Sequence, residues 1–328
     1  MEKILILPLL ISIFSVLFIT PHWIKRIKKA GITGKDMHKL DKREIAEIGG
    51  IPVLLSFILG VLLYIFLETF YFNHPENLIK IFALISSMLI IGLIGLIDDI
   101  LGWKIGLNKK SRLILLVFSA IPLIVINAGH STMMGINFGI LYPLVLIPLG
   151  IVGASATFNF LAGYNGLEAS QGILILSALS LVTYLTGSSW LSLICLIMVF
   201  CLIGFLIYNK VPALIFPGDV LTYSVGALIA ITSLLGNIEK IAIIFFIPYI
   251  IEVGLKSRGK LEKQSFGKLN EKGYLEMPYE KIYALEHFAI KILKKIKPSK
   301  NVKEIEVVLF INAIQLFFIL IGFLVMIL

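Results

Sequence analysis

Long apolar runs recur along the whole chain and are separated by short polar stretches. A helix needs about 20 apolar residues to cross about 30 Å of hydrocarbon, and ten segments approach that length. These predicted spans cover residues 3–20, 48–67, 78–97, 112–128, 140–157, 172–187, 190–207, 219–236, 238–255 and 306–328. Pro143 and Pro148 interrupt the fifth span, and Pro248 leaves a carbonyl unpaired in the ninth, where we expect a kink or a break. The pattern predicts an all-α fold, a polytopic membrane helix bundle of about ten transmembrane helices.

Composition agrees with this fold class. Hydrophobic residues make up 58% of the chain and the mean hydropathy is +0.98. So little polar surface cannot cover a soluble globule, which excludes the soluble classes of protein. Cys195 and Cys201 lie six residues apart inside the seventh span and do not share a helical face, so we expect them to be packing residues.

The basic residues are divided unevenly between the two faces of the predicted bundle. The chain has 29 Lys and Arg residues. All of them lie in the loops after spans one, three, five, seven and nine, except Lys3, Lys80 and Lys240. The positive-inside rule makes that face cytoplasmic and puts both termini outside. Anchoring to anionic membrane lipids explains the net charge of +9, so no nucleic-acid partner is expected.

Acidic and amide residues gather in the loops of the basic face. Asp98 and Asp99 end the third apolar run, and Asp219 begins the eighth. An acid pair at a membrane boundary is costly unless it binds a cation or carries out chemistry. The third of these loops places Asn159 and Asn165 among glycines, which lets the backbone approach a ligand closely.

Hard oxygen donors of this kind suit Mg²⁺, with Mn²⁺ as an alternative, held by one or two carboxylates and by substrate phosphates. Neighbouring lysines would neutralise the remaining phosphate charge, which indicates phosphoryl transfer from a diphosphate donor. The cysteines and histidines are scattered along the sequence, so zinc is not expected. No serine stands in a nucleophile-elbow pattern, which argues against a Ser-His-Asp hydrolase.

The last loop, residues 256–304, is the only one long enough for structure outside the membrane. Hydrophobic residues flank a glycine turn in LNEKGYL and predict a small cytoplasmic hairpin. Between Ile282 and Ile296 apolar residues recur at helical spacing opposite several lysines, which predicts an amphipathic helix on the cytoplasmic leaflet. Whether that helix covers a site or anchors the loop stays open, and anchoring is the simpler interpretation.

Four motifs, GLIDDILGWK, NFLAGYNGLEA, FPGD and KLNEKGYLEMPY, together resemble the polyprenyl-phosphate N-acetylhexosamine-1-phosphate transferases. The resemblance is greatest to the UDP-N-acetylglucosamine:dolichyl-phosphate branch and covers nearly the whole chain. It implies transfer of N-acetylglucosamine-1-phosphate from UDP-N-acetylglucosamine to a polyprenyl or dolichyl phosphate. It also implies a single transmembrane catalytic domain over 1–328, with 256–304 as a loop insertion. The Ile- and Lys-rich composition favours a prokaryotic, archaeal cell membrane over the endoplasmic reticulum.

The resemblance assigns roles around the phosphates. Asp219 and Asn159 match the magnesium ligands of the family. Asp98 and Asp99 match the catalytic acids beside the lipid phosphate, and Lys109 matches a lysine that contacts phosphate.

A second set of matches concerns the nucleotide sugar. Asn165 and Phe216 match the uracil site, where the ring stacks and the amide reads the polar edge. Glu47 matches an acid near the catalytic centre, and Glu168 belongs to the substrate-binding loop. Lys263 lies where eukaryotic members carry an arginine-rich stretch, so the chain departs from the family in the sugar-binding loop.

Each acid also has a purely structural interpretation. Asp98 and Asp99 would end a helix and pair with Lys109 or Arg112, and Asp219 would be the N-cap of the eighth span. A magnesium-dependent intramembrane prenyltransferase is an alternative function, although it would show two DxxxD motifs. A coupled transporter would carry its acids at the bilayer midplane. The same transfer with a different UDP-N-acetylhexosamine stays open, as does the oligomeric state, with a homodimer as one option.

Overall fold

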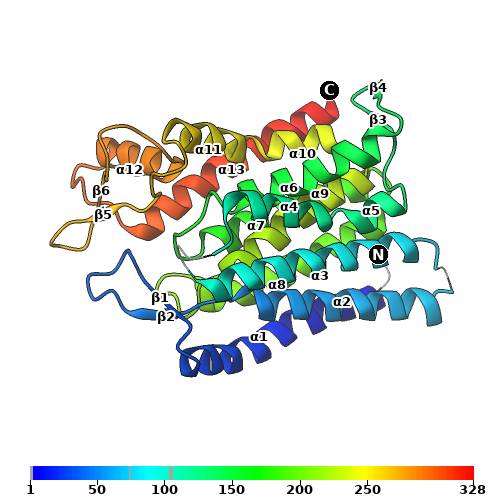
Figure 1. Ribbon diagram of the computed structural model, residues 1–328, viewed down its shortest axis with the longest axis horizontal. Helices are drawn as coiled ribbons and strands as arrows, with labels where there is room; N and C mark the ends of the chain where they lie inside the picture. The colour runs from blue at the N-terminus through cyan, green and yellow to red at the C-terminus, as the bar shows by residue number, and fades with distance from the viewer. Residues whose placement is uncertain (1–2, 74, 103–105) are drawn as a thin grey trace.

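A computed structural model describes residues 3–73, 75–102 and 106–328. Figure 1 shows long helices lying side by side along one axis, with two small hairpins and one short helix at the left-hand end and a third hairpin at the upper right. Seven helices are long and apolar enough to cross a membrane, which confirms the polytopic bundle. They are α1 (Ile6–Lys29, preceded by the 3-10 turn Lys3–Leu5), α2 (Gly50–Phe70), α3 (Leu78–Leu101), α7 (Leu167–Leu185), α8 (Ser189–Asn209), α9 (Gly218–Leu235) and α13 (Glu304–Ile327).

The other three predicted spans consist of shorter pieces in the described part of the chain. They are α4 (Lys109–Phe118) with α5 (Ile121–Val125), the π-helix η2 (Tyr142–Leu146) with α6 (Ile147–Phe158), and α10 (Glu239–Phe245) with α11 (Ile247–Arg258). Proline stands in the first turn of α5, η2, α6 and α11. Because proline lacks a backbone donor and has a fixed φ, it begins a helix more readily than it continues one. The expected break near Pro248 is confirmed, since α11 starts one residue before it.

Helix α9 forms the centre of the bundle, and every residue from Val220 to Leu235 is buried. Helices α2, α3, α6, α7, α8 and α10 pack around it. Glycines permit the closest approaches: a Cβ added to Gly226 would lie 2.5 Å from the Ala154 oxygen of α6, and one added to Gly95 of α3 would lie 2.7 Å from the Val220 nitrogen. Small residues at such crossings let membrane helices approach backbone to backbone. Gly95 therefore fixes the end of α3 against the beginning of α9.

Three short antiparallel hairpins complete the fold. They are β1 (Thr33–Lys35) with β2 (Glu44–Ala46), β3 (Thr132–Met133) with β4 (Ile136–Asn137), and β5 (Lys268–Leu269) with β6 (Leu275–Glu276). The third hairpin and the helix α12 (Leu285–Ile296) confirm the elements expected in the last loop. Leu285, Ala289 and Ile290 of α12 are buried within the protein, whereas Ile296 is 69% exposed. The apolar face of this helix is thus partly covered by the chain itself.

The two termini lie toward the right in Figure 1, away from the β1–β2 and β5–β6 hairpins. The ten spans predicted from the sequence would put both termini on one side, and the number of crossings stays a prediction. Lipid-facing positions on the outer helices are apolar and exposed, for example Phe18 of α1 (71%) and Leu320 of α13 (62%). The side of the membrane on which each end lies stays a prediction from the basic residues.

Candidate active site

Polar residues from four separate helices meet at the hairpin end of the bundle. Asp98 and Asp99 stand in the last turn of α3, Asn159 caps the end of α6, and Asp219 lies in the first turn of α9. Arg112 joins them from the first turn of α4. Contacts over more than 100 positions in sequence connect these residues, so the ends of these helices meet at one polar cluster.

The two neighbouring aspartates have different tasks. Asp99 caps α9: its Oδ1 accepts a hydrogen bond from the Asp219 nitrogen at 2.8 Å and its Oδ2 accepts one from the Val220 nitrogen at 3.2 Å. These nitrogens are among the free donors at a helix start, and a carboxylate there is favoured by the helix dipole. The hypothesis that Asp219 is the N-cap is therefore wrong, because Asp219 is the second residue of the helix and Asp99 supplies the cap from α3.

Asp98 points instead into the polar cluster and is only 4% exposed. Its Oδ2 lies 2.7 Å from Nη2 of Arg112 and accepts a hydrogen bond from the Tyr223 hydroxyl at 3.2 Å. Its Oδ1 accepts from the Leu107 nitrogen at 2.8 Å. The pairing with Arg112 that the structural interpretation expected is confirmed, and it coexists with a place in the cluster.

Asp219 faces Asp98 across the same tyrosine. The Tyr223 hydroxyl lies 3.1 Å from Asp219 Oδ2, and Asn159 Nδ2 donates to Asp219 Oδ1 at 3.0 Å. The single hydrogen of this hydroxyl can be donated to only one of the two carboxylates at a time, and Asp98 Oδ2 has Arg112 as a second partner. Sequence reasoning missed Tyr223, although a tyrosine four residues after an acid on one helix face was a usable signal.

Three carboxylates stand against one guanidinium among the described side chains of this cluster. Such an excess of negative charge at a water-poor site favours a bound cation. The backbone of Lys109 begins α4, but its side chain lies outside the described residues, so its expected contact with phosphate is not tested.

Glu47 and Phe216 lie together in a neighbouring layer. The Phe216 nitrogen donates to the Ala46 oxygen at 2.8 Å, which joins this segment to the turn before α2. The Glu47 carboxylate and the Phe216 ring both pack against Gly34 of β1, where a Cβ would lie 2.2 Å and 3.3 Å from them. Burial raises the pKa of the Glu47 carboxyl above its usual value.

Asn165 belongs to a second polar cluster, which joins the first loop to the start of α13. Its Nδ2 donates to Asp36 Oδ2 at 3.0 Å and its backbone nitrogen donates to Glu304 Oε1 at 2.9 Å. Glu304 also pairs with Lys39 Nζ at 2.6 Å and with His38 Nδ1 at 3.4 Å. Sequence reasoning missed His38 and Glu304.

Asp36, His38 and Glu304 are close enough together to hold a metal ion. The Lys39 ammonium, however, already occupies the cation position beside Glu304. Asp36 Oδ1 also accepts from the His38 nitrogen at 3.0 Å. We therefore interpret this group as a hydrogen-bonded ion cluster that holds three chain segments together.

The remaining two predicted residues lie apart from the aspartates. Glu168 is buried in the first turn of α7, where its Oε1 accepts from the Gly163 nitrogen at 2.7 Å and closes the glycine loop. Lys263 is exposed, and its ammonium lies 5.1 Å from the centre of the Tyr279 ring. Neither side chain contacts Asp98, Asp99 or Asp219 in the described structure.

A third group of buried polar residues fixes α12 against α11. Glu252 Oε2 accepts from the Leu285 nitrogen at 2.7 Å, and Lys256 Nζ lies 3.7 Å from Glu252 Oε1. Burial raises the pKa of the neighbouring Glu286. Burial, together with the charge of Lys256, lowers the pKa of His287 from 6.5 to about 4.

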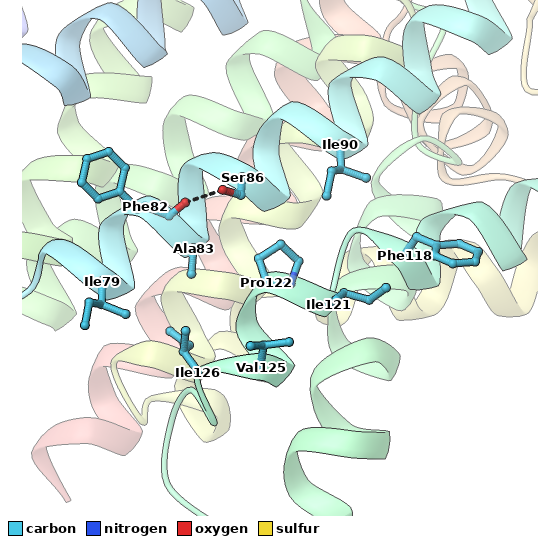
Figure 2. A pocket seen from close by; sticks show the side chains of 10 residues that line it. All are labelled: Ile79, Phe82, Ala83, Ser86, Ile90, Phe118, Ile121, Pro122, Val125 and Ile126. Carbon is cyan, nitrogen blue, oxygen red and sulfur yellow. Dashed lines mark hydrogen bonds between the residues drawn. The ribbon is translucent and has the colours of Figure 1, made fainter.

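An apolar cavity of about 530 Å³ opens between α3 and α5 (Figure 2). It is lined by Ile79, Phe82 and Ile90 of α3 and by Phe118, Pro122 and Val125. The Ser86 hydroxyl donates to the Phe82 oxygen at 2.8 Å. Ile90 stands eight residues before Asp98, about 12 Å along the helix. The cavity is therefore separate from the polar cluster.

Comparisons with known proteins agree with the motifs. The model of glycosyl transferase family 4 matches residues 81–237. A protein of Saccharolobus solfataricus is 39% identical over 296 residues, 88% of each chain, and one of Sulfolobus acidocaldarius is 34% identical over 93% of this chain and 91% of its own. Both are provisionally named UDP-N-acetylglucosamine–dolichyl-phosphate N-acetylglucosaminephosphotransferase. A Dictyostelium discoideum protein with the same name, not provisional, is 30% identical over 68% of this chain and 64% of its own.

Proposed function

This chain belongs to glycosyl transferase family 4 and is a phosphoglycosyl transferase of the UDP-sugar:polyprenyl-phosphate family, and on that premise we propose that it moves N-acetylglucosamine-1-phosphate from UDP-N-acetylglucosamine to a polyprenyl phosphate of the dolichyl type. A phosphate oxygen of the lipid attacks the β-phosphorus of the nucleotide sugar. The bond from that phosphorus to the oxygen bridging it to the α-phosphate breaks. The products are polyprenyl diphosphate N-acetylglucosamine and UMP.

One observation carries the proposal: Asp98, Asp99, Asn159 and Asp219 come from three helices and meet at the start of α9. The negative charge of a diphosphate is neutralised by a bound cation, and the carboxylate and amide oxygens of this site are suitable ligands for one. The donors also lie at helix ends, where a lipid phosphate and a water-soluble nucleotide can both arrive.

The donor set fits Mg²⁺, and Mn²⁺ has the same preference for oxygen ligands. Asp219 and Asn159 are the residues that would hold it. Asn159 turns its Nδ2 toward Asp219, so its Oδ1 is directed away from that carboxylate. When bound, the ion neutralises charge on the donor diphosphate and on the leaving UMP.

Asp98 and Arg112 then serve the acceptor phosphate. A phosphate monoester with a second pKa near 6 is already largely dianionic at pH 7, so direct displacement needs no strong base. Asp98 is held by Arg112 and Tyr223, and this fixed carboxylate orients the acceptor or takes its residual proton. Asp99 acts through α9, because it holds the helix start that carries Asp219.

The nucleotide lies toward Phe216 and Asn165 in this proposal. The Phe216 ring and the Glu47 carboxylate border the same strand, β1, that leads to the Asn165 cluster. An aromatic face stacks on a base, and an amide reads its hydrogen-bonding edge. Lys263 is exposed and lies beside Tyr279 in the last loop, where it is available to the donor diphosphate or sugar. The basic residues of these loops support a site on the cytoplasmic face.

The test uses purified full-length protein with polyprenyl phosphate and a panel of UDP-N-acetylhexosamines, with magnesium, with manganese and with a chelator. UMP should form fastest with UDP-N-acetylglucosamine and only when a divalent ion is present. Release of UDP instead of UMP, or no reaction with any sugar of the panel, would refute the transfer. Detection of a phosphorylated Asp98 or Asp99 during turnover would show a two-step route instead of direct displacement.

A further inference from the structure

The side-chain amide of Asn165 is held in one orientation by Asp36. The two residues are 4% and 2% exposed, and Asn165 Nδ2 donates to Asp36 Oδ2 at 3.0 Å. An ionised carboxylate only accepts hydrogen bonds, so the NH₂ group of Asn165 must face Asp36 and its Oδ1 must face the other way. The other oxygen of Asp36 is occupied as well, because it accepts from the His38 nitrogen at 3.0 Å.

The backbone of Asn165 is fixed independently of its side chain. Its nitrogen donates to Glu304 Oε1 at 2.9 Å, and Glu304 is itself paired with Lys39 and His38. The ring of the preceding residue, Tyr164, lies 4.1 Å from the His38 ring between centroids. Main chain and side chain are thus anchored to two different carboxylates, and only the amide orientation depends on Asp36.

The first loop connects the Asn165 cluster to Phe216. Gly34 lies in β1, and Asp36 follows the strand, where its nitrogen continues the hairpin by donating to the Arg43 oxygen at 3.1 Å, so the Cα atoms of Gly34 and Asp36 are about 7 Å apart. Gly34 faces the Phe216 ring, and Asp36 faces Asn165. Among the described residues, none donates a hydrogen bond to Asn165 Oδ1.

We propose that Asp36 is a positioning residue which selects uracil over cytosine by locking the Asn165 amide. The inference rests on the proposed function, because it concerns the UDP-sugar that the protein uses. Uracil presents an N3–H donor beside the O4 acceptor, which pairs with Oδ1 and the second Nδ2 hydrogen of the locked amide. Cytosine presents an N3 acceptor beside an amino donor, which is the reverse pattern and leaves buried polar groups unpaired.

The variant Asp36→Asn tests the lock. The Oδ1 of the new amide at position 36 can keep the bond to the His38 nitrogen. Its NH₂ group then points toward Asn165, so Asn165 Oδ1 becomes the acceptor of the hydrogen bond between the two side chains. The amide edge that faces the base then reverses. Steady-state rates with UDP- and CDP-N-acetylglucosamine give KM for each donor, and the preference for UDP is expected to fall at least about tenfold relative to wild type, with a smaller change in kcat.

The matched control is Glu304→Gln, which weakens the bond to the Asn165 backbone but leaves Asp36 in place. We expect it to lower Tm and to raise both KM values by the same factor. If Asp36→Asn does not fold, Asp36→Ser replaces it, because a hydroxyl both donates and accepts and no longer imposes one orientation. An unchanged UDP:CDP ratio in the folded Asp36 variant would overturn the inference. Failure of the wild type to form UMP would instead refute the proposed function.

Discussion

Replacing Gly95 by alanine is expected to disable the active site while the rest of the bundle stays folded. Gly95 lies where α3 crosses the start of α9, one helical turn before Asp99. A Cβ at this position would lie 2.7 Å from the Val220 nitrogen and 2.8 Å from the Asp219 carbonyl carbon. Both neighbours are backbone atoms of a buried helix, so no side chain can rotate to make room.

The size of the effect follows from these distances. Ordinary contacts between carbon atoms are about 3.5–4.0 Å, so the two helices must separate by about 1 Å. Overpacking of this kind costs about 1–3 kcal/mol in stability. The same movement lengthens the bonds from Asp99 to the Asp219 and Val220 nitrogens, and a misplacement of about 1 Å costs on the order of 100-fold in rate.

Gly92→Ala is the matched control on the same helix. Its Cβ would lie 2.2 Å from Leu54 Cδ2, which is the end of a flexible side chain and can move. The assay is the initial rate of UMP release for both variants, with Tm in detergent as the measure of folding. We expect kcat to fall about 100-fold for Gly95→Ala and no more than about threefold for Gly92→Ala. Equal losses in the two variants, or near-normal activity of Gly95→Ala, would refute the proposed role of this helix contact.

Three further predictions concern single side chains. Asp219→Asn should lower kcat by at least about 100-fold and raise the magnesium concentration needed for half-maximal rate, and an unchanged magnesium titration would contradict its role as a ligand. Tyr223→Phe removes the hydroxyl shared by Asp98 and Asp219, so UMP release should slow about tenfold, whereas a full rate would make that contact dispensable. The His287 pKa is lowered from 6.5 to about 4, so its neutral form contributes stability above pH 6.5 that is lost as the pH falls toward 4. The Tm of His287→Asn should therefore decline less over this interval than that of wild type, and parallel declines would count against the assignment.

The sequence predicts the helices well where apolar length alone decides the outcome. Seven runs without a proline in their middle became single helices, because a chain in lipid must satisfy its backbone internally. Where prolines fall in the middle of a run, the pattern still predicts a membrane segment, but it does not predict the bounds of the shorter helices that make up the segment. The π-helix before Ile147 and the break before Pro248 depend on how neighbouring helices satisfy the freed carbonyls.

The sequence predicts the three aspartates and Asn159 of the candidate site, but not Tyr223 between them and not the different roles of Asp98 and Asp99. Asp98 and Asp99 are adjacent in sequence, yet successive helical residues point about 100° apart, so one faces Arg112 and the other caps α9. No local signal assigns those tasks. The partnership of Asn165 with Asp36 joins positions 129 residues apart and arises only from the packing of separate loops.

The most direct measurement follows the fate of each phosphate of the nucleotide sugar. UDP-N-acetylglucosamine labelled with ³²P at the β-phosphate, and separately at the α-phosphate, is incubated with the protein, magnesium and polyprenyl phosphate, and the mixture is extracted with organic solvent. The account predicts that the β-label enters the lipid phase with the sugar while the α-label stays in water as UMP. Sugar transfer with both labels left in water as UDP would contradict it.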